Sequence, residues 1–232
     1  MGAMAMAAMR QGAATSMRDM HCHILPGVDD GACDINESLR MLEAAKQVGI
    51  TSIVCTPHCR RPYFDFDAMW QAFYQLKQHA GDFPISMGFE VNHNMLMELG
   101  MEWADKLAFQ DTSEFLLELS TNAQEHHFRE YEGTIYQLQA RGYEVIIAHP
   151  ERYKAIQKDV GIARRLVEMG CKLQASCDFV AGGRLGAERK PAKKLFEENL
   201  YTYMASDAHC VEHYEYFKRA QQRYKTRGKH VR

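Results

Sequence analysis

The sequence has no long apolar run and no excess of charge of one sign. None of the apolar stretches in its 232 residues approaches the roughly 20 residues that a membrane-spanning helix needs. The opening MGAMAMAAMRQGAATSM lacks the continuous apolar core of a secretory signal. Lys and Arg number 28 against 30 Asp and Glu, so the formal net charge of -2 gives no reason to expect nucleic acid or anionic lipid as a partner. We therefore predict a cytoplasmic protein without membrane insertion.

The sequence also lacks the cysteine patterns of secreted and zinc-ribbon proteins. Its seven cysteines are an odd number, are scattered along the chain and include no Cys-x-x-Cys pair. Disulfide-stapled domains carry even numbers of cysteines, and zinc ribbons carry two Cys-x-x-Cys pairs. We therefore expect the thiols to be reduced.

Short apolar runs alternate with helical patterns along most of the chain. The runs predict seven strands, at 18–21, 52–55, 84–87, 114–117, 144–148, 172–175 and 201–205. Helical spacing of apolar residues predicts helices at 35–48, 67–79, 124–141, 160–169, 187–198 and 212–224. The first helix starts with a capping box, Asp34 and Glu37, and ends at Gly49. This alternation indicates parallel strands with right-handed crossovers, in either an α/β barrel or a doubly wound sheet.

The chain shows no internal division after its first residues. Residues 1–16 are rich in Met and Ala and carry no pattern that could bury a face against a sheet, so we predict a disordered leader there. From residue 17 onward no linker, repeat or low-complexity block interrupts the sequence. Residues 17–232 are therefore predicted to form a single domain.

Residues that can bind metals collect at the ends of the predicted strands. His21 and His23 close the first strand, and Asp207 and His209 follow the last. Residues two apart in an extended chain point to the same face, so each pair can hold one cation. Because all strand ends of a barrel open into one bowl, this pattern favours the barrel over the doubly wound sheet. The candidate metal ligands are His21, His23, Asp30, His58, Glu90, Glu118, His149, Asp207 and His209.

The charges of these candidates indicate more than one cation. Four carboxylates beside five neutral histidines suit two or three divalent ions, with a positive surplus for a phosphate dianion or a bridging hydroxide. Asp19, two residues before His21, is expected to accept a hydrogen bond from that imidazole. Three further histidines, His93, His126 and His127, are expected to lie in loops or face solvent and not to bind metal.

Six motifs occur in an order that resembles one enzyme superfamily. They are DMHCHILPGVDDG, TPH, GFE, LLELS, IAHPERY and SDAH. They resemble the polymerase and histidinol phosphatase (PHP) superfamily, and specifically its bacterial metal-dependent protein-tyrosine phosphatases from capsular and exopolysaccharide loci. The similarity runs from about Arg18 to about His209. It implies a distorted (β/α)7 barrel of the PHP type.

The resemblance also implies roles for individual residues. It implies three divalent ions, with manganese expected and iron, zinc or magnesium as alternatives. Arg152, in HPERY, matches a phosphate-binding arginine, and Arg152, Asp207 and His209 are the expected catalytic residues. The implied ligand sets are His21, His23, Glu90 and Asp207 for the first ion, Glu90, Glu118 and His149 for the second, and Asp30, His58 and His209 for the third.

One stretch departs from that branch of the superfamily. A second phosphate-binding arginine usually follows the last ligand histidine by about five residues, whereas here the stretch is CVEHY. Arg60 and Arg61 are the expected substrate-binding replacements, with Lys218 and Arg219 as alternatives.

The resemblance implies that the protein hydrolyses phosphotyrosine by means of a metal-bridging hydroxide. The expected substrate and partner is the tail of a bacterial polysaccharide-export tyrosine kinase. Two other functions stay open, a small-molecule phosphatase of the histidinol-phosphate type and a non-catalytic metal-binding regulator of a kinase. Self-association into a homo-oligomer also stays open.

Overall fold

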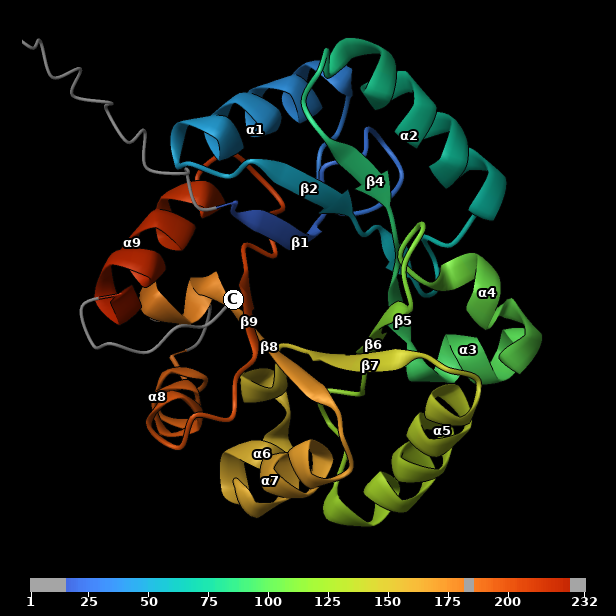
Figure 1. Ribbon diagram of the computed structural model, residues 1–232, viewed down its shortest axis with the longest axis vertical. Helices are drawn as coiled ribbons and strands as arrows, with labels where there is room; N and C mark the ends of the chain where they lie inside the picture. Colours follow the sequence, from blue (N-terminus) through green and yellow to red (C-terminus); the bar gives the residue numbers. More distant parts are fainter. Residues whose placement is uncertain (1–15, 182–185, 226–232) are drawn as a thin grey trace, which may run out of the picture.

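Parallel strands form a ring that is surrounded by helices in the computed structural model (Figure 1). The structure describes residues 16–181 and 186–225. The predicted leader therefore lies outside the described residues, apart from Ser16. No helix within the described ranges is long and apolar enough to cross a membrane.

The strands belong to two parallel sheets. One sheet has the order β1-β2-β4, and the other has the order β3-β5-β6-β7-β8-β9. The strand bounds are β1 (Arg18–Cys22), β2 (Ser52–Cys55), β3 (His58–Cys59), β4 (Ile85–Met87), β5 (Glu90–Asn92), β6 (Glu114–Glu118), β7 (Glu144–Ala148), β8 (Lys172–Ser176) and β9 (Tyr203–Ala205).

Backbone hydrogen bonds join these two sheets into one distorted barrel. The second predicted strand, 52–55, is β2 and is followed after a break by the short β3, and the third, 84–87, corresponds to β4 and is followed after a break by the short β5. Across these breaks, Gly88 N donates to Cys55 O at 2.9 Å and Glu90 N donates to Pro57 O at 3.2 Å. On the other side, Asp207 N donates to His21 O at 2.8 Å, which joins β1 to the end of β9. The predicted seven-stranded (β/α)7 barrel is thus confirmed, with two interrupted strands that the apolar pattern did not reveal.

The helices differ from the prediction mainly in the middle of the chain. Two short helices, α3 and α4, were not predicted, and α6 precedes α7 where one helix was expected. The expected helix at 124–141 starts as a short 3-10 turn, η2. The helix bounds are α1 (Ile35–Gln47), α2 (Phe66–His79), α3 (His93–Leu99), α4 (Ala104–Leu107), α5 (Phe128–Ala140), α6 (Lys154–Lys158), α7 (Gly161–Glu168), α8 (Arg189–Glu197) and α9 (His213–Lys225), and the 3-10 turns are η1 (Met101–Trp103), η2 (Glu125–His127), η3 (Pro150–Arg152) and η4 (Cys177–Ala181).

An extra residue in β1 sets which side chains face the barrel interior. Asp19 pairs with Ile53 and Cys22 pairs with Cys55, so two residues of β1 lie opposite one residue of β2. Such a β-bulge re-aims the side chains that follow it. Met20 therefore belongs to the small interior cluster, while Cys22 packs into the large outer core. The interior cluster is made of Met20, Val54, Phe109, Leu116, Ile146, Ala148 and Ala205, and it fills the barrel.

One buried hydroxyl ties together the ends of β6 and β7. Tyr153 Oη donates to Ala148 O at 2.7 Å and accepts from Leu119 N at 2.9 Å, and its ring is fully buried. We predict that Tyr153→Phe lowers the free energy of unfolding by about 1–3 kcal/mol, because both backbone groups lose a buried partner. Urea denaturation measures this, with Tyr136→Phe on the exposed side of α5 as the control. Equal midpoints for the two variants would contradict the prediction.

Candidate metal centre

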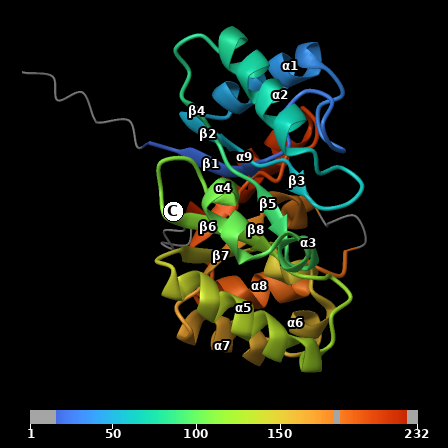
Figure 2. The ribbon, with the colours of Figure 1, turned by 90° about the vertical axis from the view of Figure 1, so that its right-hand side faces the viewer.

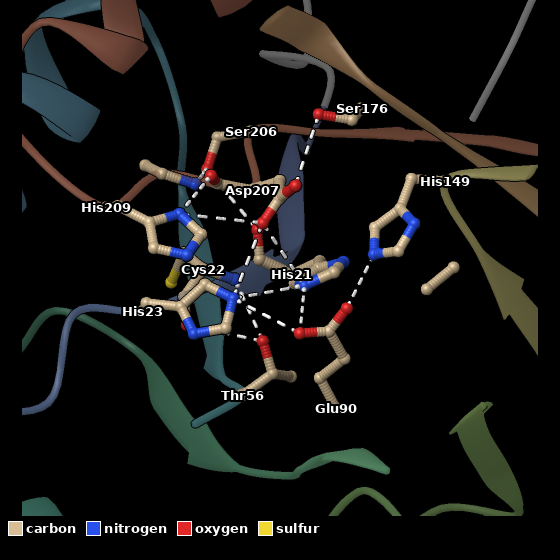
Figure 3. Close-up of polar contacts among 12 residues, drawn as sticks. His21, Cys22, His23, Thr56, Glu90, His149, Ser176, Ser206, Asp207 and His209 are labelled. Atoms are coloured by element: carbon tan, nitrogen blue, oxygen red, sulfur yellow. Dashed lines mark hydrogen bonds and ion pairs between the residues drawn. The ribbon is translucent and has the colours of Figure 1, made fainter. Parts of the chain in front are cut away.

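All nine candidate ligands meet at the barrel mouth, where the strands end. Seven of them are buried, His209 is half-buried and Asp30 is exposed. Figure 3 shows the imidazoles of His21, His23 and His209 beside the carboxylates of Glu90 and Asp207. The residues therefore converge although they are separated by up to 188 positions in the chain, from His21 to His209.

Ligand atoms form three overlapping groups that could each hold an ion. His21, His23 and Asp207 form the first group, and His58, Glu90 and Glu118 form a second. His23, Asp30, His58 and His209 form the third. The structure therefore brings together the predicted residues, and these groups overlap with the implied ligand sets. His58 also lies near Glu90 and Glu118, and His23 also lies near Asp30, His58 and His209. His149 contacts Glu90, with its Nε2 2.6 Å from Glu90 Oε1.

The first group has the spacing that ligands of one cation require. His21 Nε2 lies 3.3 Å from His23 Nε2, and both nitrogens lie 3.4 Å from Asp207 Oδ1. Adjacent ligands around a cation with bonds of about 2.0–2.2 Å are separated by about 3.0–3.5 Å. Glu90 Oε2 lies 3.5 Å from each of the two nitrogens.

Hydrogen bonds to the other ring nitrogens fix which atoms face the centre. His21 Nδ1 donates to Gln174 Oε1 at 2.9 Å, and His23 Nδ1 donates to Asp29 Oδ2 at 2.8 Å. Since both partners are acceptors, each Nδ1 carries a proton, and Nε2 is the atom that each ring can offer to a metal ion. The two Nε2 atoms lie 3.3 Å apart beside carboxylates, an arrangement that needs a positive charge between them. The donor set therefore fits a divalent metal ion.

The electrostatic environment of these groups leads to the same conclusion. Burial alone would lower the pKa of His21, but Glu90 and Asp207 outweigh it and raise that pKa to about 9. Burial would raise the pKa of Asp207, but Arg152 and His21 hold it well below its usual range. The buried carboxylate of Asp207 thus stays ionised and needs positive charge nearby, which protons supply when ions are absent.

Two of the candidate ligands have an unusual backbone conformation. His149 has φ of 32° and Asp207 has φ of 50°, both in the left-handed region that residues with a Cβ seldom adopt. Asp207 N donates to His21 O, so the strained position is fixed by the barrel closure. Strain of about 1–3 kcal/mol at such positions persists where the surroundings hold the side chain in a working geometry.

The comparisons with known proteins agree with this geometry. The sequence profile of the family described as "Capsular polysaccharide synthesis, CpsB/CapC" matches residues 17–225. The chain belongs to the CpsB/CapC family. It is 35% identical over 203 residues to the tyrosine-protein phosphatase YwqE of Bacillus subtilis, with 84% of this chain and 78% of that protein covered. It is 30% identical over 201 residues to the putative tyrosine-protein phosphatase CapC of Staphylococcus aureus, with the same coverage.

Solved structures support the CpsB/CapC assignment and the barrel. A crystal structure from a study of YwqE and Streptococcus pneumoniae CpsB, described there as metal-dependent tyrosine phosphatases, superposes with a TM-score of 0.74 at 30% identity. That match covers 90% of this chain and 87% of the other. A histidinol phosphate phosphatase from Lactococcus lactis superposes with a TM-score of 0.57 at 12% identity, covering 93% and 95% of the two chains. The second likeness shows the PHP-type fold alone.

The arginines of this CpsB/CapC chain lie in three different environments. Arg152 reaches into the mouth, with Nη2 2.5 Å from Asp207 Oδ2 and 3.0 Å from Asp178 Oδ2. Arg60 lies over the third group, with Nη2 2.8 Å from His58 Nε2 and 3.5 Å from Asp30 Oδ2. Arg61 points away from the mouth, pairs with Glu98 and is 75% exposed. The alternatives Lys218 and Arg219 are exposed on α9.

Sequence reasoning gave one wrong contact at the CpsB/CapC centre and missed two others. Asp19 does not contact the His21 ring, because Asp19 lies on the outer side of the bulged strand and accepts from Ser206 Oγ at 2.5 Å. Gln174 takes the predicted place of Asp19. A glutamine inside an apolar strand was a usable signal for this role. Asp29 orients His23, although only its neighbour Asp30 was predicted to act at the site.

Proposed function

We propose that this chain is a metal-dependent protein-tyrosine phosphatase. The observation that carries the proposal is the buried set of imidazoles and carboxylates at the barrel mouth, placed beside Arg152, in a chain of the CpsB/CapC family. Relatives named tyrosine-protein phosphatase match over 84% of the chain. We further propose a bacterial tyrosine kinase as the physiological substrate and the cytoplasm as the location.

The proposed ligands are the nine residues at the mouth, holding two or three divalent ions with manganese as the expected metal. When bound, such ions lower the pKa of water and neutralise charge on a phosphoryl group. Gln174 and Asp29 orient His21 and His23 for this purpose. Arg152 holds Asp207 in place and presents the rest of its guanidinium to an incoming phosphate.

Aromatic and basic residues at the rim suit a phosphorylated phenol. The Tyr63 ring stacks on His58, with ring centroids 5.8 Å apart, and the Arg60 guanidinium lies 5.6 Å from the Tyr63 centroid. The Arg60 Nε is buried and has no hydrogen-bond partner among the described residues. We therefore assign the second phosphate contact to Arg60 and not to Arg61, whose charge is already paired with Glu98.

A cysteine-phosphatase mechanism does not fit the structure, although Cys55 and Arg61 have the Cys-x5-Arg spacing. Burial raises the pKa of the Cys55 thiol far above its ordinary value, so no thiolate forms near neutral pH. Arg61 lies at the surface and binds Glu98. The thiol and the guanidinium therefore cannot form a phosphate loop.

Comparison of two substrates tests the proposal against its alternatives. Protein loaded with manganese is assayed on a phosphotyrosine peptide and on histidinol phosphate, with chelator-treated protein as the control. We expect hydrolysis of the peptide, loss of activity with chelator and recovery on adding metal. A strong preference for histidinol phosphate would support the small-molecule alternative. Binding of a kinase tail without hydrolysis of any phosphoester would support the regulator alternative.

The residue that orients His23 gives a test that does not depend on turnover. We predict that Asp29→Asn weakens metal binding about 10–100-fold, because the amide no longer accepts a charge-assisted hydrogen bond from His23 Nδ1. Competition with a metal-binding dye measures the affinity. Asp67→Asn on the exposed side of α2 is the matched control. Identical affinities for the two variants would contradict the role given to Asp29.

A further inference from the structure

Six exposed basic side chains form a ridge on two neighbouring helices. Lys154 and Lys158 lie on α6, and Arg189, Lys190, Lys193 and Lys194 lie on α8. The helices α6 and α8 pack against each other, and Figure 2 shows them side by side. Glu197 is the only acidic residue within the bounds of these two helices. The basic ridge is therefore strongly positive, although the whole chain has a formal charge of -2.

Three of these charges have no carboxylate partner among the residues that the structure describes. Lys193 pairs with Glu197 at 3.5 Å, and Lys158 bonds the Gln124 side chain at 3.4 Å. Within residues 16–181 and 186–225, no carboxylate lies within 4 Å of the charged groups of Lys154, Arg189 or Lys190. The nearby acid Glu198 is paired with Arg164. These three cations are thus free to bind an anion from outside.

The stability of α8 does not explain the basic ridge. Arg189 and Lys190 occupy the first turn, where cations oppose the positive end of the helix dipole. Lys193 follows Arg189 by four residues, and Lys194 follows Lys190 by four residues. Like charges therefore face each other on the outer side of the helix. Both arrangements destabilise a helix. The buried face, made by Pro191, Ala192, Leu195 and Phe196, needs none of these charges.

The basic ridge begins beside the candidate metal centre. The turn η3 ends at Arg152, whose guanidinium contacts Asp207, and α6 starts two residues later at Lys154. The helix α8 packs directly against η3. A peptide whose phosphate reaches Arg152 can therefore continue over Lys154 onto α8.

We infer that the basic ridge binds an acidic stretch that flanks the phosphotyrosine of a protein substrate. This inference rests on the proposed phosphatase function, because it places one segment of the substrate along α6 and α8 while the phosphotyrosine occupies the mouth. Charge complementarity and continuity with Arg152 favour an acidic peptide over a membrane surface. A peptide can extend from the basic ridge to Arg152 inside the barrel mouth, whereas a flat membrane surface cannot enter the mouth.

A charge-removal variant with a matched control tests the inference. Lys154→Gln, Arg189→Gln and Lys190→Gln are combined on the basic ridge, and Arg40→Gln, Lys46→Gln and Lys77→Gln are combined on the exposed sides of α1 and α2. Both variants lose three charges. Two phosphotyrosine peptides are compared, one with Asp and Glu flanks and one with the matching Asn and Gln flanks. The measured quantity is the ratio of kcat/KM for the acidic peptide to kcat/KM for the neutral peptide.

We expect the ridge variant to lower this ratio about 10-fold at low ionic strength and the control variant to leave it unchanged. Added salt should lower the wild-type ratio, because exposed charges are screened. An equal ratio in wild type and ridge variant overturns the inference. Loss of binding to phosphatidylserine vesicles by the ridge variant, without any change in the peptide ratio, also overturns it and indicates a membrane role.

A direct binding measurement separates this inference from the proposed function. Fluorescence anisotropy of the unphosphorylated acidic peptide needs no hydrolysis. If wild type and control bind this peptide and the ridge variant does not, the inference that the basic ridge binds acidic peptides is supported. This result does not depend on hydrolysis of a phosphotyrosine peptide. If all three proteins bind the acidic peptide equally, the inference about the basic ridge is wrong. The phosphatase function is then decided separately by the assay on the phosphotyrosine peptide and histidinol phosphate.

Discussion

Replacing His21 and His23 together with alanine is expected to abolish turnover and lower the number of bound metal ions. Both Nε2 atoms face the same point, 3.3 Å apart and 3.4 Å from Asp207 Oδ1, so the double variant deletes two of the three members of the first ligand group. Metal ions stabilise a phosphoryl transition state by several kcal/mol, which corresponds to a rate loss of roughly 1,000-fold or more.

Two measurements on the same preparations test this result. Elemental analysis of protein purified without chelators gives the number of ions per chain, and a phosphotyrosine peptide assay gives the rate. The control is the double substitution His126→Ala and His127→Ala, which removes two adjacent histidines whose rings lie 3.9 Å apart on exposed η2. We expect the control to keep metal and activity. Unchanged metal content in the His21 and His23 variant would refute the ligand assignment.

The sequence was sufficient to place the site because most candidate ligands lie at or shortly after the end of a predicted strand. Strands β6 and β7 are each five residues long and carry continuous apolar runs, so their ends could be located from the sequence. Glu118 closes β6 and His149 follows β7 directly. Parallel strands bring such ends together whatever the distance along the chain. The barrel and the gathering of these residues were therefore predictable.

The internal details of the site depend on single-residue irregularities that periodicity does not encode. The bulge between Asp19 and Cys22 sends Asp19 to Ser206 and leaves Gln174 to bind His21. The left-handed conformation of His149 re-aims its side chain after the strand has ended. Whether Asp29 or Asp30 contacts a given histidine depends on the loop conformation. Patterns of apolar residues predict elements and their order, but not these local changes of direction.

The overlap between the ligand groups could not be predicted for a related reason. The resemblance implies a single ion each for His23 and His58, whereas in the structure each of these residues belongs to two groups of possible ligands. The rings of His23 and His58 have centroids 4.2 Å apart, so ligands from neighbouring strands lie between sites. Side-chain direction, and not order in the chain, decides this grouping.

Substituting Arg152 by lysine is expected to separate phosphate binding from support of the metal site. Arg152 Nη2 lies 2.5 Å from Asp207 Oδ2, while Asp207 Oδ1 faces His21 and His23. Lysine keeps the positive charge beside Asp207 but cannot offer two parallel N–H groups to a phosphate. We therefore predict that Arg152→Lys keeps its metal content, lowers kcat/KM for a phosphotyrosine peptide about 100-fold and weakens inhibition by inorganic phosphate.

The inhibition constant for inorganic phosphate is the deciding measurement, because a residue that only supports Asp207 would not change it at full metal occupancy. Arg61→Lys is the matched control, since Arg61 is exposed and paired with Glu98 outside the mouth. We expect the control to match wild type in kcat/KM for the phosphotyrosine peptide and in the inhibition constant for inorganic phosphate. If Arg152→Lys loses metal but binds phosphate normally once metal is restored, Arg152 is a positioning residue for Asp207, and the phosphate must then be held by Arg60 and the metal ions alone.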